Sequence, residues 1–517
     1  MPDSSFIASL LADQADLSAV ERFAQRHAQA TEPSLSPHYR DLVPLTAPRP
    51  GEQYAFAVDL DACTGCKACV TACHSLNGLD PDESWRRVGT LVGEEAHGGA
   101  VLQTVTMACH HCADPGCLRG CPVGAYDKDG LTGIVRHLDD QCIGCRYCVM
   151  MCPYDVPQYS VSRGIVRKCD MCHGRLAAGE APACVQACPN ESIRIRVVPT
   201  QAVPTLRMAD APASSLTRPT TRYRSRRRNA TRWQAIDAEQ ATPADAHGPL
   251  VAMLTASQLA VGLLVASLAG SAWLPPERTS ALAAVGGLVL LLGLAASLRH
   301  LGRPSKAWRA FLGLRTSWLS REIVAFGGLA ALAGAYVASA WGTGPTSVSS
   351  LALGSAAAAV GLAGVACSAM VYHATGRRLW HFVSSGGQFF GTTATLGAAG
   401  LGLAATASAP AVAATCAAGV ALVTVLKLAG FVALLCCDTG RETLPIARTA
   451  RLLRGRLRAL SVLRLTAAAL VLPLAAGLAG GNWLAAALVF ATTLAGESIE
   501  RMLFFRAISP ARMPGSL

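Results

Sequence analysis

The pattern of hydrophobic and polar residues divides the chain near residue 248. Beyond that point, long apolar runs alternate with short polar segments, and each run reaches the roughly 20 residues that a helix needs to cross a bilayer. Eight such runs lie at about 249–274, 279–298, 318–341, 347–373, 382–408, 410–437, 459–482 and 484–505. Four of them contain no Asp, Glu, Lys or Arg, so these helices would have no polar face to turn toward water. The pattern predicts an all-α bundle of eight transmembrane helices over residues 248–517.

The first half of the chain has a different pattern, in which short strand-like runs lie between turns. Runs such as YAFAVDL, GIVRHLD and SIRIRVV over residues 51–200 are typical of a small α+β domain. The spacing of apolar residues in residues 1–50 predicts a helical arm, which is followed by a linker. Residues 201–247 are rich in Pro, Ala, Thr and Arg, which is the composition of a second linker. The sequence therefore predicts an arm, an α+β domain, a linker and a helical membrane domain.

The composition agrees with a membrane protein and argues against two other classes. Hydrophobic residues make up 51% of the chain and charged residues 15%, compared with about 25% charged residues in average soluble chains. Neither a disordered chain nor an ordinary soluble enzyme is expected. The net charge of +12 comes from basic residues that lie beside the apolar runs, which indicates membrane topology rather than nucleic-acid binding.

The basic residues alternate between the two sides of the predicted bundle. Alternate connections, together with the C-terminal tail, carry fifteen of them, whereas the intervening connections carry Arg278 alone. The fifteen are Arg299, Arg303, Lys306, Arg309, Arg315, Arg377, Arg378, Arg441, Arg448, Arg451, Arg454, Arg456, Arg458, Arg506 and Arg512. The positive-inside rule predicts that these loops and the α+β domain lie on the cytoplasmic side of the inner membrane. The N-terminus shows no basic region followed by an apolar core, so no secretory signal is expected.

Sixteen of the twenty cysteines lie in the α+β domain, in four groups of four. The groups are Cys63, Cys66, Cys69 and Cys73; Cys109, Cys112, Cys117 and Cys121; Cys142, Cys145, Cys148 and Cys152; and Cys169, Cys172, Cys184 and Cys188. The first and third groups have the C-x2-C-x2-C-x3-C spacing of bacterial ferredoxins. In that motif three thiolates hold one cubane, and the fourth reaches the other cluster of a pair.

Zinc is the alternative metal, because C-x2-C pairs also build tetrahedral zinc sites. Zinc does not account for a third and a fourth cysteine at these regular short spacings. We therefore predict a ferredoxin-like iron–sulfur domain with four [4Fe–4S] clusters, and such a row of clusters serves one-electron transfer.

These motifs bear a family resemblance. Residues 53–197 resemble the four-cluster subunit of molybdopterin oxidoreductases of the dimethyl-sulfoxide reductase, polysulfide reductase and sulfite dehydrogenase kind. The resemblance implies nested pairing, first group with fourth and second with third, although spacing alone leaves a first-with-second pairing open. The implied ligand sets are Cys63, Cys66, Cys69 with Cys188; Cys169, Cys172, Cys184 with Cys73; Cys109, Cys112, Cys117 with Cys152; and Cys142, Cys145, Cys148 with Cys121. In some relatives an aromatic residue at the position of Cys145 gives a three-iron cluster, which is not expected here.

The membrane half resembles the eight-helix anchor subunit of the same complexes. The resemblance covers roughly residues 249–506 and is carried by RHLGRPSKAWRAF, SWLSREI, VYHATGR and AGESIER. The chain is therefore similar to a fusion of two subunits that are normally separate polypeptides. The family's anchor has a quinol site that faces the iron–sulfur subunit, and the matching positions here are His300, Gly302, Lys306, Trp308 and Glu322.

Two of these residues also suit the chemistry on their own account. Quinol oxidation releases two electrons and two protons, and it therefore needs a proton acceptor beside an apolar slot. His300 titrates near neutrality, and Glu322 at the start of the third helix is a carboxylate that can take or relay a proton. The alternative is that Arg321 and Glu322 form an interfacial ion pair and that His300 contacts lipid headgroups.

Lys427 lies ten residues inside the sixth apolar run and is the other intramembrane candidate. The alternative is a structural ion pair with Glu497 or Glu500. The four remaining cysteines are expected to be packing residues; they are Cys367, Cys416, Cys436 and Cys437. No histidine pair is placed to bind haem in the bilayer core, so no haem is expected.

Together these observations predict an electron-transfer and quinone-reactive membrane component of an oxidoreductase. The substrate site is expected on a separate molybdopterin catalytic chain, with electrons passing between the quinone pool, four clusters and that partner. The cytoplasmic orientation favours sulfite oxidation coupled to quinone reduction. An electron-transfer module of a formate dehydrogenase or hydrogenase is the first alternative. A membrane transporter regulated by zinc is the second, from another class.

Overall fold

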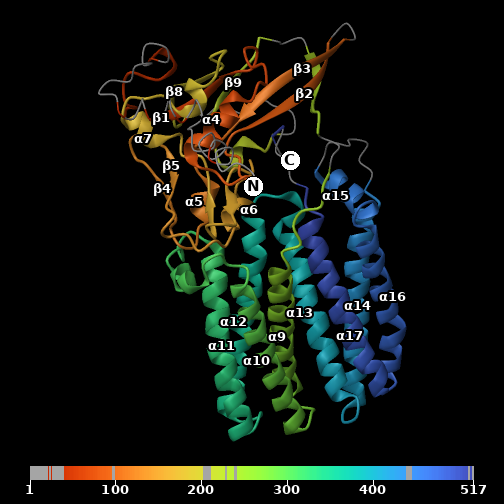
Figure 1. Cartoon of the computed structure of the whole chain (residues 1–517). Coiled ribbons are helices and arrows are strands. Elements are labelled where there is room, and N and C mark those ends of the chain that lie inside the picture. The colour runs from red at the N-terminus through yellow and green to blue at the C-terminus, as the bar shows by residue number, and fades with distance from the viewer. Residues whose placement is uncertain are drawn as a thin grey trace.

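The computed structural model describes residues 40–517, apart from 96–98, 202–210, 227–229, 238–240, 438–444, 510–512 and 515–517, together with four single residues nearer the N-terminus. Of the arm and linker predicted at residues 1–50, only residues 40–50 and these four single residues are described, so that most of the predicted arm lies outside the described residues. The described chain has two parts. A Cys-rich domain of short strands and helices sits on one end of a bundle of long helices (Figure 1).

The Cys-rich domain contains two three-stranded sheets and two hairpins, as predicted for an α+β domain. The central strand β1 (Glu52–Asp59) pairs antiparallel with β8 (Ile193–Pro199) and parallel with β9 (Arg222–Arg224). In the second sheet β2 (Arg87–Glu95) lies between β3 (Ala100–Met107) and β10 (Ala230–Ala235). The hairpins are β4 (Tyr126–Lys128) with β5 (Val135–His137), and β6 (Gln158–Ser160) with β7 (Ile165–Arg167). The helices are α4 (Ala68–Asn77), α5 (Gly116–Gly120), α6 (Tyr147–Met151), α7 (His173–Ala177) and α8 (Ala183–Gln186).

The segment predicted as a linker at 201–247 differs from that prediction in its described part, because it supplies β9 and β10. The Thr220 hydroxyl donates to the His110 carbonyl at 2.8 Å and accepts from the Gln53 side chain at 3.3 Å. The Ser225 hydroxyl donates to Asp61 at 2.8 Å. This segment is therefore built into the Cys-rich domain, and the pairing partners lie more than 120 residues away in the sequence.

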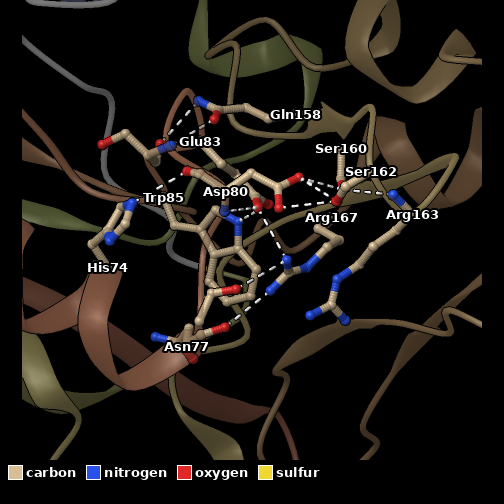
Figure 2. Close-up of polar contacts among 12 residues, drawn as sticks. His74, Asn77, Asp80, Glu83, Trp85, Gln158, Ser160, Ser162, Arg163 and Arg167 are labelled. Atoms are coloured by element: carbon tan, nitrogen blue, oxygen red, sulfur yellow. Dashed lines mark hydrogen bonds and ion pairs between the residues drawn. The ribbon is translucent and has the colours of Figure 1, made fainter. Parts of the chain in front are cut away.

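A buried arginine ties the β6–β7 hairpin to the loop that follows α4 (Figure 2). The Arg167 guanidinium lies 3.1 Å from the Glu83 carboxylate and donates to the Asn77 carbonyl at 3.0 Å. The Glu83 carboxylate also accepts from the Trp85 indole N–H at 2.7 Å. Because Asn77 follows Cys73 on α4 and Arg167 precedes Cys169, this network fixes the first and fourth cysteine groups relative to each other.

The second half contains eight helices of 22 to 26 residues among the described residues. They are α9 (Gly248–Gly270), α10 (Pro276–Leu298), α11 (Trp318–Gly342), α12 (Val348–His373), α13 (Phe382–Ala405), α14 (Pro410–Leu435), α16 (Arg458–Ala479) and α17 (Trp483–Arg506). The short helices η3 (Pro304–Phe311) and α15 (Pro445–Arg454) lie in loops that face the Cys-rich domain (Figure 1). Within the described residues, six of the eight are long and apolar enough to cross a membrane. The other two are α13 and α17, which carry more polar residues, so that a bundle of eight spanning helices stays a prediction.

Small residues allow the helices to approach closely, which is a common way for membrane helices to associate. The helix α9 packs against α10, α12, α13 and α17. At its crossing with α13, a side chain on Gly262 would place Cβ 2.5 Å from the Thr393 carbonyl oxygen. A side chain on Gly397 would likewise lie 2.7 Å from the Gly262 carbonyl oxygen. These glycines are therefore required for the contact between the two helices.

The Cys-rich domain docks directly on the bundle through hydrogen bonds and a shared hydrophobic cluster. The Arg303 N–H donates to the Ile143 carbonyl at 3.0 Å, and the Ser317 hydroxyl donates to the Gly120 carbonyl at 2.7 Å. The helix α6, with Tyr147, shares one hydrophobic cluster with the bundle. The connection between α10 and α11 therefore seats the loops of the second and third cysteine groups on the membrane domain.

Candidate functional site

The four C-x2-C turns share one backbone feature. In each turn, the residue before the second cysteine has a positive φ; these are Gly65, His111, Gly144 and Met171. In three of the turns this residue points its N–H at the first cysteine sulfur at 3.4 Å. Two of the four positions are not glycine, although a positive φ is uncommon for other residues. Such turns can direct several cysteine sulfur atoms toward one bound group.

The second and third groups face each other across two small cavities. One cavity is lined by Cys109, Cys112, Cys117 and Cys152, and the other by Cys121, Cys142, Cys145 and Cys148. Each set takes three cysteines from one group and the last cysteine of the other. The structure therefore brings these residues together in the nested arrangement that the family resemblance implies, while ligation itself stays a prediction.

The first and fourth groups are also neighbours. Burial raises the pKa of the Cys63 thiol, and the nearby Cys188 raises it further. The pKa of Cys73 is likewise raised by burial and then by Cys184 and Cys172. These interactions place Cys188 with the first group and Cys73 with the fourth.

The donor set fits iron–sulfur clusters. Burial raises the pKa of the thiols of Cys117, Cys145 and Cys172 to about 12, so that these groups need a nearby metal charge to be thiolates. Among the described residues, no three His, Cys, Asp or Glu side chains come close enough together to hold a single metal ion. The thiols of each inner set surround a shared cavity instead, which suits a polynuclear cluster.

A buried cation faces the outer cysteines. Arg86 is 2% exposed and donates to the Thr106 hydroxyl at 3.2 Å. Burial alone would lower the pKa of this guanidinium, but the charges of the surrounding cysteines, Cys184, Cys69, Cys169 and Cys73, raise it overall. Sequence spacing could not identify Arg86, because the residue is brought to these cysteines only by the folded chain.

An apolar cavity of about 450 Å³ lies where the Cys-rich domain meets α10 and α11, and its volume is typical of ligand pockets. Most of its lining is aliphatic or aromatic. The polar and redox-relevant groups that line it are Cys145, Tyr147, Ser297, His300, Glu322 and Tyr372. Cys145 also lines the cluster cavity of the third group, so that the two cavities share one wall.

His300 and Glu322, two of the five predicted quinone-site residues, both line this cavity. His300 makes a hydrogen bond with the backbone of Cys145, and within the described structure its Nε2 atom is buried without a partner. Burial lowers the pKa of His300 to about 4, with further lowering from His247 and Arg146. His300 is therefore neutral near pH 7. The buried Glu322 carboxylate accepts a hydrogen bond from the Ser368 hydroxyl.

The other three predicted residues do not line the cavity. Gly302 packs against Gly164 of the Cys-rich domain, where an added Cβ would lie 2.0 Å from the Gly164 carbonyl oxygen. Lys306 donates to the Asp140 carbonyl at 3.0 Å. Trp308 is 61% exposed and faces outward from η3. Of the five predicted residues, only His300 and Glu322 are therefore placed to contact a quinone in this cavity. The sequence analysis did not single out Tyr147 or Tyr372 as site residues, although Tyr147 lies within the third cysteine group and Tyr372 within the VYHATGR segment.

Comparison with known proteins identifies the two parts of the chain. Residues 246–506 match the family model for the DMSO reductase anchor subunit (DmsC), which is half of the chain, and residues 100–197 match a 4Fe–4S dicluster domain. The chain belongs to the family of DMSO reductase anchor subunits. It carries the iron–sulfur domain in the same polypeptide, so that the predicted fusion of electron-transfer domain and membrane anchor is confirmed.

Several curated relatives match about a quarter of this DMSO reductase family chain. The B subunit of the anaerobic dimethyl sulfoxide reductase of Haemophilus influenzae is 42% identical over 27% of this chain and 71% of its own length. The thiosulfate reductase electron transfer subunit PhsB of Salmonella typhi is 38% identical over 28% and 74%. The hydrogenase-2 operon protein HybA of Escherichia coli is 35% identical over 25% and 48%.

Within the anchor domain, Lys427 is paired, as the structural alternative predicted. It forms an ion pair with Glu497 and lies 2.9 Å from the Glu500 carboxylate. The Arg464 guanidinium also donates to Glu500, with a distance of 3.0 Å from Nε. Arg501 donates to Gln258 on α9 at 2.9 Å. Buried charges in a bilayer are stable only when they are paired, and here the pairs join α14, α16 and α17.

The segment predicted as a linker also reaches one of the expected clusters. The hydroxyl of Thr217 lies 3.4 Å from the sulfur of Cys112, and it becomes the donor when Cys112 is a thiolate. Replacing Thr217 with valine should lower the midpoint potential of one cluster, because the thiolate loses a hydrogen bond that stabilises the reduced state. A redox titration followed by EPR measures this shift.

Thr220→Val is the matched control, because Thr220 is equally buried but donates to a backbone carbonyl. The control should cost about 1 kcal/mol of stability without moving any potential. An unchanged potential in Thr217→Val would show that this hydroxyl does not act on a cluster.

Proposed function

We propose that this chain passes electrons between a membrane quinone and a separate molybdopterin catalytic chain. The main support for this proposal is that Cys145 lines both the cluster cavity of the third group and the apolar cavity that His300 and Glu322 also line. A ligand in the apolar cavity would therefore contact the wall of a cluster site. The names of the dimethyl sulfoxide reductase and thiosulfate reductase relatives support a complex of this kind.

Four [4Fe–4S] clusters would supply one-electron transfer across the domain. The cysteine sets described above would hold them, and the N–H groups of His111, Gly144 and Met171 would stabilise the thiolates. The cluster of the third group would lie nearest the membrane. Cys66 is exposed, which suits the first group to a place beside the catalytic chain.

In the cavity, the residues of this chain would bind a quinol and take its protons. The free Nε2 atom of His300 would hydrogen-bond one oxygen of the ring, since this imidazole is neutral and lacks another partner in the described structure. Oxidation of the quinol releases two electrons and two protons; Glu322, held by Ser368, would accept one proton, and the unpartnered Nε2 atom of His300 would accept the other. The apolar remainder of the cavity would exclude water.

Two directions of electron flow have support. The names of the relatives favour quinol oxidation coupled to a reductase. The basic loops and the iron–sulfur domain lie at the same end of the bundle (Figure 1). If that end is cytoplasmic, the second candidate function, sulfite oxidation coupled to quinone reduction, is favoured. The cytoplasmic location in the inner membrane is itself part of this proposal.

Metal content provides the first test. The complex, purified from its native membrane through a C-terminal tag on this chain, should contain about sixteen iron atoms per chain, with similar acid-labile sulfide. It should also contain one molybdenum or tungsten atom with a large partner chain. Zinc in place of iron would contradict electron transfer, and iron without molybdenum or tungsten would contradict the proposed partner.

A further inference from the structure

A buried lysine lies between two of the expected cluster sites. Lys168 follows β7 directly and precedes Cys169, the first cysteine of the fourth group. Its side chain lines the cavity of the second group, together with Cys109 and Cys117. The residue is 3% exposed, so that water screens its charge only weakly. Lys168 therefore contacts the site of the second group with its side chain and adjoins the fourth group along the chain.

Two backbone carbonyls hold the ammonium of Lys168 in this position. The Nζ atom donates to the Cys169 carbonyl at 2.8 Å, and it also donates to the Val135 carbonyl at the start of β5. In the described structure these hydrogen-bond partners are neutral groups rather than carboxylates. A buried cation is costly unless a negative charge lies nearby. The thiolates of the two adjoining cluster sites supply that charge.

The cysteines of both groups act on this lysine. Burial alone would lower the pKa of the ammonium, but the charges of Cys109, Cys117 and Cys169 raise it overall. Asp170 is a carboxylate that adds to this effect, and it acts more weakly than the three thiols. Burial and then Cys109 raise the pKa of the Cys169 thiol, so that these two sulfur atoms are also neighbours. The second and fourth groups therefore meet at Lys168.

This position is central in the proposed electron path. The third-group cluster would lie nearest the membrane, because Cys145 also lines the apolar cavity. The first group, with the exposed Cys66, suits a place beside the catalytic chain. The second-group and fourth-group clusters would then form the middle of the row. An electron that crosses the domain would pass between these two clusters beside Lys168.

We propose that Lys168 raises the midpoint potentials of the second-group and fourth-group clusters together, and that it thereby favours electron entry into the middle of the row. This inference rests on the proposed four clusters and adds a residue that tunes two of them. Four thiolates give a [4Fe–4S] cluster a net negative charge, which increases when the cluster takes an electron. A fixed cation between two such clusters stabilises the reduced state of both, because the interior screens charge poorly.

Lys168→Gln tests the charge separately from the hydrogen bonds. Glutamine can donate to a carbonyl as lysine does, but it is neutral. The purified complex is titrated with dithionite in the presence of redox mediators, and EPR measures the midpoint potential of each cluster. Two of the four potentials should fall. Each should fall by about 59 mV or more, which is a loss of about 10-fold in the ratio of reduced to oxidised cluster at a fixed potential.

Two further variants separate charge from structure. Lys168→Arg keeps the cation, and both potentials should stay within about 2-fold of the wild-type ratio. Arg163→Gln is the matched control for net charge, because Arg163 lies on the turn between β6 and β7 and is exposed. Water and salt screen an exposed charge, so that all four potentials of this control should stay within the same limit.

A fall in any other number of potentials in Lys168→Gln, or an equal fall in Lys168→Arg, would overturn the proposed effect of the charge. Iron analysis accompanies each titration, because a lost cluster removes a signal without shifting its potential. If Lys168→Gln contains less iron than the wild type, Lys168→Met takes its place, since methionine has a similar length and no charge. Loss of iron from both neutral variants would assign Lys168 to cluster assembly and would also overturn the proposal. A wild-type complex with zinc in place of iron would instead contradict the proposed function.

Discussion

Replacing Cys145 with alanine should stop quinol from reducing the clusters. The variant should also contain fewer than the roughly sixteen iron atoms of the wild type. Cys145 lies in the wall between the third-group cluster cavity and the apolar cavity, so that its loss affects the cluster nearest the quinol. The rate of quinol-driven reduction should fall by about 100-fold or more, beyond the 10–100-fold typical of changes to residues that only support a metal ligand. Stopped-flow spectroscopy measures that rate, and iron analysis measures the metal.

The resemblance to the molybdopterin oxidoreductase family sharpens this expectation. Relatives with an aromatic residue at the position of Cys145 have a three-iron cluster, so that the alanine variant should show a three-iron EPR signal. Cys416→Ala in α14 is the control, because this buried cysteine belongs to none of the four groups. Full iron content and a normal rate in Cys145→Ala would show that Cys145 is not a cluster ligand.

The cysteine grouping was accessible from the sequence because ligand spacing is a local property. The C-x2-C turns require only a few residues to present two thiols, and the positive φ before the second cysteine recurs in all four groups. Arg86 and Thr217 were not accessible in the same way. Each reaches a cysteine through tertiary contacts, Arg86 beside Cys69 and Thr217 beside Cys112, and neither has a residue type that marks it as a neighbour of sulfur.

The sequence did not predict the strands β9 and β10 in the segment 201–247, for a related reason. The strand β9 is three residues long and contains two exposed arginines, so that its composition indicates a solvated segment. It becomes a strand because β1 offers an unpaired edge, and β1 lies about 165 residues earlier. Local composition cannot report a partner at that distance in the chain.

In the membrane half, apolar runs located the helices, whereas the roles of single polar residues depended on packing. His300 and Glu322 were identified by their chemistry, and both line the cavity. Lys306 was expected beside them but extends to the Asp140 carbonyl of the Cys-rich domain. That contact exists only because the α10–α11 loop is also the docking surface for that domain, which no helical pattern reveals.

Replacing Glu322 with glutamine should lower quinol-driven turnover by about 100- to 10,000-fold, the usual contribution of a general acid–base group. Glu322 is buried in the cavity, and a quinol oxidised there must lose two protons to its surroundings. Glutamine has nearly the same shape and can still hydrogen-bond Ser368, but it cannot accept a proton. The maximal rate should therefore fall while the dissociation constant for quinone changes by only about 2-fold.

Glu277→Gln is the matched control, because Glu277 is an exposed carboxylate at the start of α10, at the opposite end of that helix from the cavity. Its turnover should equal that of the wild type. The clusters of Glu322→Gln should still be reduced by dithionite, since electron transfer within the iron–sulfur domain does not involve this carboxylate. A loss of turnover that arises through weaker quinone binding alone would assign Glu322 to binding, because a proton acceptor acts on the maximal rate.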